Sequence, residues 1–109
     1  QDNFTLYGGV NTRTFLYIDD CVDAFIKLWK TKSAHNDIYN LGGLNEMSIH
    51  SVASMLMDLM NKKGELTVYP APKGSVNRRW PDITKIKNAI DWQPTTELSV
   101  GLGRTLETL

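Results

Sequence analysis

The chain has 109 residues, of which 12 are lysine or arginine and 12 are aspartate or glutamate, so its formal net charge is zero. This balance argues against a nucleic-acid partner or an anionic membrane surface, because both attract basic proteins. A chain of this length forms one domain or part of one, and no apolar run approaches the roughly 20 residues that cross a bilayer.

The chain contains a single cysteine, Cys21. One cysteine excludes an internal disulfide and fits a reducing compartment, so we expect a soluble, cytoplasmic protein. The two histidines, His35 and His50, have no cysteine or carboxylate at ligand spacing. We therefore predict no metal site.

The first third of the chain predicts two strands and a helix. Residues 4–7 form the first expected strand, which ends at Gly8 and Gly9. Residues 14–18 are β-branched, aromatic or aliphatic and predict a second strand. Asp20 is expected to cap the following helix, because a carboxylate there binds free backbone N–H groups. We expect Cys21 to be buried on the apolar face of this helix. That face comprises Cys21, Ala24, Phe25, Leu28 and Trp29.

The middle of the chain predicts a strand and a longer helix. Residues 37–41 are mostly apolar and are followed by Gly42 and Gly43, which is typical of a short strand. Ser48 is expected to cap the next helix, and Gly64 is expected to end it. The apolar face of this helix comprises Ile49, Val52, Ala53, Leu56, Leu59 and Met60.

A strand over residues 66–69 is expected to run into a long loop. Pro70 and Pro72 exclude a continuation of the strand, so the loop should extend to about Trp80. Asp82 is then expected to cap a short helix. The apolar side chains of that helix are Ile83, Ile86 and Ile90.

The final helix is expected to start at Thr95 or Thr96 and to present Leu98, Leu102, Leu106 and Leu109 on one face. Gly101 and Gly103 each weaken a helix by about 1 kcal/mol relative to alanine, so we expect close packing at Gly101. Trp92, beside a proline turn, is expected to pack in the interior.

Three motifs occur in an order found in one enzyme family. They are R-T-F-L-Y-I-D-D-C-V-D-A from Arg13, I-Y-N-L-G-G-L-N-E from Ile38, and R-R-W-P-D-I-T-K from Arg78, followed by D-W-Q-P from Asp91 and Gly101-Leu102. Together they resemble the extended short-chain dehydrogenases/reductases, the NAD(P)-dependent sugar-nucleotide epimerases, dehydratases and decarboxylases. These are isomerases and lyases of carbohydrate metabolism.

The resemblance covers nearly the whole chain and implies a mixed α/β fold. Members of the family have about two domain lengths, so residues 1–109 are expected to form one truncated domain, the C-terminal substrate-binding lobe. The last strand and helix that pack on a Rossmann sheet are included. The N-terminal Rossmann half would be missing.

Catalysis in this family rests on a glycine-rich turn that binds the dinucleotide and on a helical Tyr-x-x-x-Lys pair. The glycine pairs of this chain have the wrong spacing for that turn. Tyr69 and Lys73 have the spacing of the catalytic pair, but the two prolines between them exclude a regular helix. The full-length family uses NAD or NADP; for this chain alone we expect neither a bound cofactor nor catalysis.

The resemblance implies substrate-binding roles for Arg13, Asn45, Arg78 and Arg79. A sugar nucleotide carries a diphosphate, whose oxygens suit the two parallel donors of a guanidinium. The alternatives are a surface ion pair for Arg13, a plain turn for Asn45, and a solvated loop for the other two arginines. Which of Arg78 and Arg79 faces the ligand is left open.

Two functions follow. The first is the nucleotide-sugar-binding portion of an NAD(P)-dependent epimerase, 4,6-dehydratase or decarboxylase. The second is a noncatalytic interaction or dimerisation module derived from that fold. Without the Rossmann half, we expect apolar surface on Phe25, Trp29 and Tyr39 to be exposed. The chain would then form a homodimer, pair with a missing Rossmann-domain partner, or be a piece cut from a longer protein.

Overall fold

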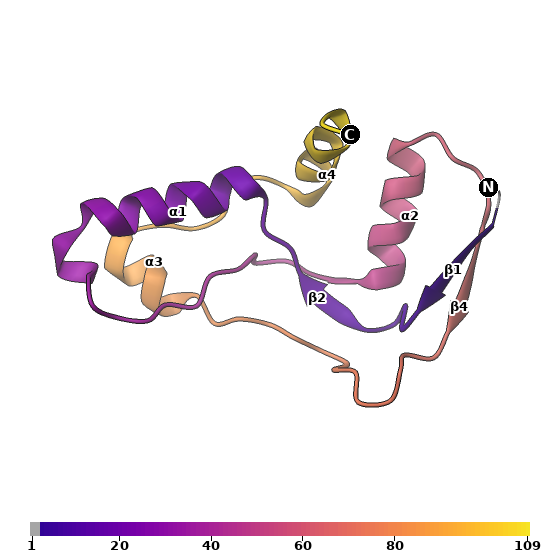
Figure 1. The fold of residues 1–109 in the computed structure, drawn as a ribbon, viewed down its shortest axis with the longest axis horizontal. Helices are drawn as coiled ribbons and strands as arrows, with labels where there is room; N and C mark the ends of the chain where they lie inside the picture. The colour runs from indigo at the N-terminus through magenta and orange to yellow at the C-terminus, as the bar shows by residue number, and fades with distance from the viewer. Residues whose placement is uncertain (1–2) are drawn as a thin grey trace. The chain divides into compact units, whose positions relative to one another are not determined.

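The computed structural model describes residues 3–109 as a mixed α/β fold; residues 1 and 2, with which the predicted domain begins, lie outside the described part. The elements are β1 (Asn3–Tyr7), β2 (Thr12–Thr14), α1 (Ile18–Lys30), the 3-10 helix η1 (Lys32–Ala34), β3 (Glu46–Ser48), α2 (Ile49–Leu59), β4 (Glu65–Tyr69), α3 (Thr84–Ile90) and α4 (Leu98–Glu107) (Figure 1).

The chain divides into two compact units, each made of two separate stretches of sequence. The strand unit contains the described residues up to Arg13 together with Glu46–Arg79. The helical unit contains Thr14–Asn45 and Trp80–Leu109. The two units are described separately.

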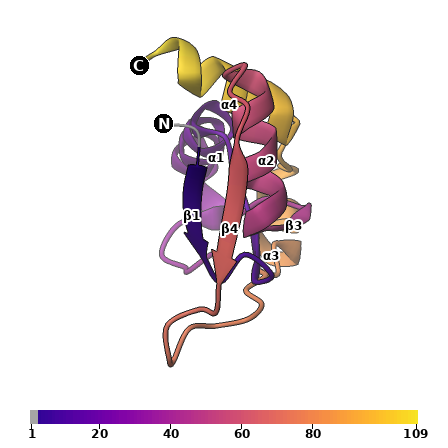
Figure 2. The ribbon, with the colours of Figure 1, turned by 90° about the vertical axis from the view of Figure 1, so that its right-hand side faces the viewer.

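In the strand unit, β1 and β4 form a parallel pair, with α2 beside it (Figure 2). The register runs from Asn3 opposite Glu65 to Tyr7 opposite Tyr69, where the two rings stack with their centroids 5.5 Å apart. Both strands confirm the sequence prediction. Gly8, at φ +68°, turns the chain out of β1, a backbone conformation that glycine adopts without strain.

Helix α2 begins where the sequence predicts. The backbone N–H of Ser51 donates to the hydroxyl of Ser48 at 3.1 Å, so Ser48 caps the helix. The predicted end at Gly64 is wrong, because α2 stops at Leu59 and Asn61 adopts a left-handed φ of 54°. Asparagine tolerates this conformation and can end a helix in place of glycine.

The strand predicted over residues 14–18 is wrong. Strand β2 covers only Thr12–Thr14, residues 15–17 have no regular structure, and α1 starts at Ile18. The apolar run has another cause, because Leu16 packs against the core of the helical unit. A short apolar run predicts burial, and burial does not require a strand.

The predicted capping role of Asp20 is also wrong. Tyr17 occupies the N-cap of α1 and makes no side-chain capping bond. The carboxylate of Asp20 instead accepts bonds from the backbone N–H groups of Thr95 at 3.3 Å and Thr96 at 3.0 Å, and from the Thr95 hydroxyl at 3.1 Å. Asp20 therefore joins α1 to the segment that precedes α4.

No strand forms over residues 37–41, contrary to the prediction. A strand needs a neighbour for its backbone hydrogen bonds, and none of the described strands pairs with this segment. Its apolar side chains are used in packing, since Tyr39 and Leu41 lie against the core of the helical unit.

The core of the helical unit lies between α1, α3 and the turn after α3. It is formed by the buried side chains of Ala24, Ile83, Ile86 and Trp92. The predicted interior position of Trp92 is confirmed, with 1% of the residue exposed, and its indole N–H donates to the carbonyl oxygen of Asp20 at 3.2 Å. The predicted capping position of Asp82 is wrong by one residue, because Ile83 occupies the N-cap of α3 without a side-chain capping bond. The carboxylate of Asp82 still accepts from the backbone N–H of Thr84 at 2.9 Å.

The predicted close contact at Gly101 is confirmed. Gly101 of α4 is buried, and a Cβ atom there would lie 3.1 Å from Cδ1 of Tyr17. A Cβ atom at Gly103 would meet no atom within 4 Å. The first glycine is therefore needed for packing, and the second is not.

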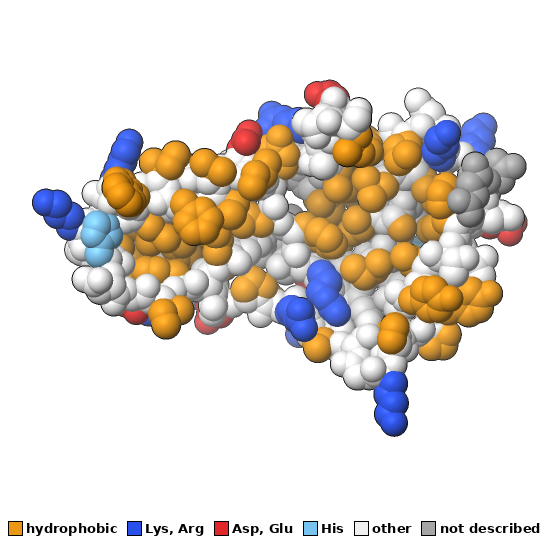
Figure 3. Space-filling model, in the orientation of Figure 1, with side chains coloured by type: hydrophobic (Ala, Val, Ile, Leu, Met, Phe, Trp, Pro, Cys, Tyr) orange, Lys and Arg blue, Asp and Glu red, His pale blue; other side chains and the backbone are white. Residues whose placement is uncertain are grey.

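One side of α1 is apolar and exposed. Trp29 is 81% exposed and Phe25 62% exposed, as predicted, whereas Tyr39 and Cys21 are half-buried. Hydrophobic side chains gather along α1 in Figure 3. Among residues 3–109, no helix has the length and apolar character needed to cross a membrane.

Candidate functional site

Strand β2 positions the first predicted ligand contact. Arg13 is half-buried, and its Nη1 donates to the carbonyl oxygen of Thr12 at 2.7 Å. The guanidinium is therefore turned back along its own strand. The carbonyl oxygen of Thr12 is the acceptor with which the contacts of the other site residues are compared.

The loop after β4 brings the other two arginines to β2. The backbone N–H of Thr12 donates to the carbonyl oxygen of Asn77 at 2.8 Å, and Thr12 forms a parallel β-bridge with Arg78. The backbone N–H of Arg79 donates to the carbonyl oxygen of Thr12 at 3.4 Å. Three of the predicted residues, Arg13, Arg78 and Arg79, therefore lie on adjacent backbones, although the sequence separates them widely.

Arg78 and Arg79 differ in what their side chains contact. The Nε of Arg78 donates to Oε2 of Glu46 at 2.7 Å. Within residues 3–109, the Arg79 side chain is exposed and makes no hydrogen bond or ion pair. Side chains of consecutive residues in extended backbone point to opposite sides, so the pairing of Arg78 with Glu46 turns Arg79 the other way.

Glu46 is a residue of this site that sequence reasoning missed. Its Oε2 also accepts a bond from the hydroxyl of Thr12. The bonds from Arg78 and then from Thr12 hold the pKa of Glu46 below its ordinary value, so the carboxylate is ionised at neutral pH. The available signal was its place in the second motif, directly after Asn45.

The fourth predicted residue, Asn45, belongs to the helical unit and is exposed. It remains a prediction. The Tyr69 to Lys73 stretch is strand followed by turn, which fits the two prolines and not the helix that the catalytic pair requires.

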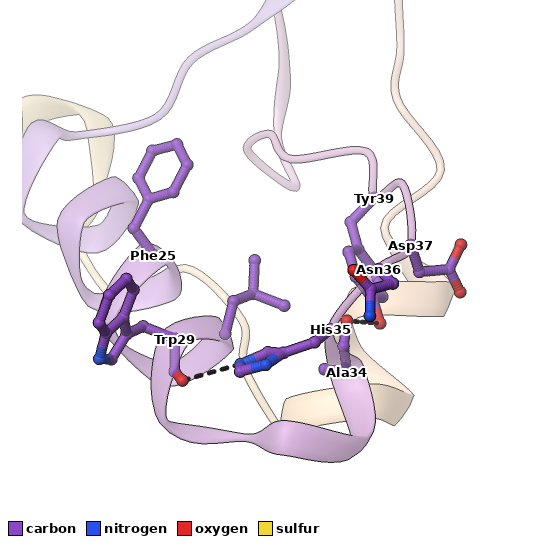
Figure 4. A pocket seen from close by; sticks show the side chains of 8 residues that line it. Phe25, Trp29, Ala34, His35, Asn36, Asp37 and Tyr39 are labelled. Atoms are coloured by element: carbon purple, nitrogen blue, oxygen red, sulfur yellow. Dashed lines mark hydrogen bonds between the residues drawn. The ribbon is translucent and has the colours of Figure 1, made fainter.

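A hollow of about 420 Å³ lies at the end of α1 in the helical unit (Figure 4). Phe25 and Trp29 line it from α1, and Tyr39 lines it from the segment after η1. Two of its polar side chains already have partners: His35 bonds to the carbonyl oxygen of Trp29 at 2.9 Å, and Asp37 accepts from Lys85 at 2.6 Å. We find no activated acid–base pair in this hollow. Across residues 3–109, no group of three or more histidine, cysteine or carboxylate side chains could hold a metal.

Gly8, Gly42 and Gly43 each lie close against another part of the protein. A Cβ atom at Gly43 would clash with the carbonyl oxygen of Phe15, and one at Gly42 would clash with the Pro81 ring. One at Gly8 would lie 2.9 Å from Cβ of Ala71. Each close approach is filled by protein, whereas a dinucleotide needs open glycine backbone at the start of a helix.

Comparison with known proteins identifies relatives over almost the same range as the motifs. A family model described as GDP-mannose 4,6 dehydratase matches residues 1–105. The chain is 34% identical over 102 residues to GDP-mannose 3,5-epimerase of Arabidopsis thaliana, covering 93% of this chain and 26% of the relative. It is 32% identical over 106 residues to UDP-glucuronic acid decarboxylase 1 of Xenopus tropicalis, covering 96% and 25%.

A solved structure of a nucleotide-sugar epimerase also matches this chain. UDP-glucuronic acid 4-epimerase from Bacillus cereus, in complex with UDP-glucuronic acid and NAD, matches with a TM-score of 0.79 and 33% identity, covering 90% of this chain and 32% of that chain. The chain therefore belongs to the GDP-mannose 4,6-dehydratase family of extended short-chain dehydrogenases/reductases, which act on nucleotide sugars. It spans about a quarter of the length of these curated relatives.

Proposed function

We propose that this chain is the nucleotide-sugar-binding portion of an NAD(P)-dependent epimerase, dehydratase or decarboxylase, and that Arg13 and Arg79 bind the diphosphate. The observation that carries the proposal is the shared oxygen of Thr12, which accepts from the Arg13 side chain and from the Arg79 backbone. Two guanidinium groups on adjacent backbones match the charge and donor needs of two linked phosphates.

The other two predicted residues take lesser roles. Arg78 is bound by Glu46, so we assign it to the support of the site. Asn45 is exposed and remains a candidate for a further polar contact. Of the two loop arginines, we therefore propose Arg79, and not Arg78, as the one that faces the ligand.

We propose ligand binding, and no hydride transfer, for this chain alone. The NAD of the Bacillus cereus epimerase belongs to that protein, and the close glycine approaches of this chain are filled by its own side chains and backbone. The two side chains that we propose for ligand binding, Arg13 and Arg79, are guanidinium groups that stay protonated, so they orient a phosphate without moving a proton at the sugar.

The test is an amide NMR titration of the chain with UDP, GDP, dTDP and inorganic pyrophosphate in turn. Replacing Arg13 or Arg79 with alanine should weaken binding of the preferred ligand about tenfold or more, because each loses charge-assisted hydrogen bonds. Lys63→Ala is the matched control, since Lys63 is an exposed cation of the same unit. If both arginine variants bind like the wild type, or if no ligand shifts any peak, the proposed function is wrong.

A second candidate function is an interaction module, favoured by the exposure of Phe25 and Trp29. The partner would be a second copy of the chain or a Rossmann domain supplied separately. Replacing both residues with serine should lower self-association in sedimentation experiments and leave the unfolding free energy within about 0.5 kcal/mol of the wild type. A wild-type chain that is monomeric at every concentration tested would exclude the homodimer.

A further inference from the structure

Glu46 occupies a central position in the strand unit. It is the first residue of β3, and its side chain is 23% exposed. One oxygen, Oε2, accepts from the hydroxyl of Thr12 on β2 and from Nε of Arg78 in the loop after β4. This carboxylate therefore joins three segments that are far apart in the sequence.

The two partners of Glu46 are the residues that hold the diphosphate-binding arginines in place. Thr12 carries the carbonyl oxygen that accepts from Nη1 of Arg13 at 2.7 Å and from the backbone N–H of Arg79 at 3.4 Å. Arg78 directly precedes Arg79 and forms the β-bridge to Thr12. The side-chain bonds of Thr12 and Arg78 therefore add to the backbone pairing of β2 with β3 and with the loop, and help to hold the backbone that carries both guanidinium groups.

Charge gives a second argument. An unpaired carboxylate near a diphosphate would repel it, but Glu46 is paired with Arg78 at 2.7 Å. The pair is close to neutral as a unit, so the positive charge of Arg13 and Arg79 remains available for the ligand. The lowered pKa of Glu46 agrees with this, because the carboxylate stays ionised and keeps its bonds at neutral pH.

We propose that Glu46 is a positioning residue of the diphosphate site: it binds Thr12 and Arg78 and so holds Arg13 and Arg79 at the Thr12 carbonyl oxygen before a ligand arrives. This inference rests on the proposed function, and Glu46 itself does not touch the ligand. Two arginines whose backbone is already ordered lose less conformational freedom on binding than two on a mobile backbone, which raises affinity.

The first experiment needs no ligand. Hydrogen exchange at the backbone N–H of Arg79 reports the bond to the carbonyl oxygen of Thr12. In Glu46→Ala this exchange should accelerate, while exchange at the β1–β4 ladder should stay at the wild-type rate. Glu65→Gln, which removes a carboxylate at an exposed position of the same unit, is the control. Equal protection of Arg79 in Glu46→Ala and wild type would overturn the inference.

The second experiment measures affinity for inorganic pyrophosphate and for the three nucleoside diphosphates. Glu46→Ala should weaken binding about tenfold, and Glu46→Gln should weaken it less, because its amide oxygen still accepts one bond. In an Arg79→Ala background, Glu46→Ala should have little further effect, since the group it positions is gone. A loss of the same size in both backgrounds would indicate a general structural effect and overturn the inference.

The two experiments separate the two proposals. Pyrophosphate affinity that depends on Arg79 but not on Glu46 would leave the proposed function in place and remove the positioning role. Arg79 protection that depends on Glu46, in a chain that binds none of the four ligands, would overturn the proposed function and, with it, the role of Glu46 in a diphosphate site. Tighter binding by Glu46→Gln than by wild type would also overturn the inference, because the carboxylate would then be repelling the ligand.

Discussion

Asp20 of the helical unit and Glu46 of the strand unit are carboxylates that each join distant segments of the sequence, and they have different partners. Asp20 of the helical unit is buried and accepts only from neutral donors, the backbone and hydroxyl groups of Thr95 and Thr96. Glu46 of the strand unit accepts from the hydroxyl of Thr12 and from the cation of Arg78. Asp20 ties α1 to the segment that precedes α4, and Glu46 forms an ion pair with Arg78.

The carboxylates of Asp20 and Glu46 are kept ionised by different surroundings. Burial raises the pKa of Asp20, but the hydrogen bonds from Thr96 and Thr95 together outweigh it, so the pKa lies below its ordinary value. Glu46 reaches the same ionised state mainly through the bond from Arg78. The charge of Asp20 is stabilised by neutral hydrogen-bond donors, and the charge of Glu46 is stabilised by an ion pair with Arg78.

The largest expected effect comes from removing the core that encloses Asp20. Trp92→Ala should lower the unfolding free energy of the helical unit by about 3–5 kcal/mol, because it deletes a fully buried indole and its bond to the Asp20 carbonyl. Chemical denaturation followed by residue-resolved NMR measures this. Trp29→Ala, at an exposed position of the same unit, is the matched control and should change stability by less than about 0.5 kcal/mol. Similar losses in both variants would contradict the core assignment.

An intermediate effect is expected at Asp20 itself. Asp20→Ala should cost about 1–3 kcal/mol, because the N–H groups of Thr95 and Thr96 lose their acceptor. Since the folded pKa is lowered, this contribution is complete above the unfolded pKa, near 3.8, and is lost as the pH falls from there through the folded pKa. Asp20→Asn should therefore show a shallower loss of stability below pH 3.8 than the wild type. An Asp19→Asn control with the same shallowing would count against this assignment.

The smallest expected effect is the difference in stability between alanine substitutions at Gly101 and Gly103 of α4. Gly103→Ala should stabilise α4 by about 1 kcal/mol, because alanine is the better helix former and nothing lies within reach of the new methyl group. Gly101→Ala should lose that gain, since its Cβ would lie 3.1 Å from the Tyr17 ring. Thermal unfolding of the two single variants measures the difference. Equal midpoints would show that the Tyr17 contact is relaxed in solution.

The parts of the fold that the sequence predicts correctly depend on local interactions. The start of α2 follows from Ser48, whose hydroxyl reaches the Ser51 N–H three residues away. Strands β1 and β4 follow from apolar residues bounded by glycine and proline. The failed strand at residues 37–41 needed information from a neighbouring strand, which no pattern inside the segment provides.

The cations of the candidate site follow from the sequence, but their arrangement does not. Arg13, Arg78 and Arg79 follow from their motifs, whereas the choice of Arg79 over Arg78 depends on a bond between Arg78 and Glu46, whose positions are 32 apart in the sequence. The role of Asp20 was missed for the same reason, because its partner Thr95 is 75 positions away. Residue type predicts the chemistry that a side chain can perform, and long-range contacts decide which chemistry it does perform.

The parallel pairing of β1 with β4 has a consequence for how the chain folds. Within residues 3–109, β4 is the strand that pairs with β1, so this pairing cannot form during synthesis until Glu65–Tyr69 has been made. Closing so long a loop is entropically unfavourable and slow, and an unpaired strand edge invites association with other chains. The helical unit closes a loop of similar length, between Asp20 and Thr95, so neither unit can be complete until the later of its two stretches of sequence has been made.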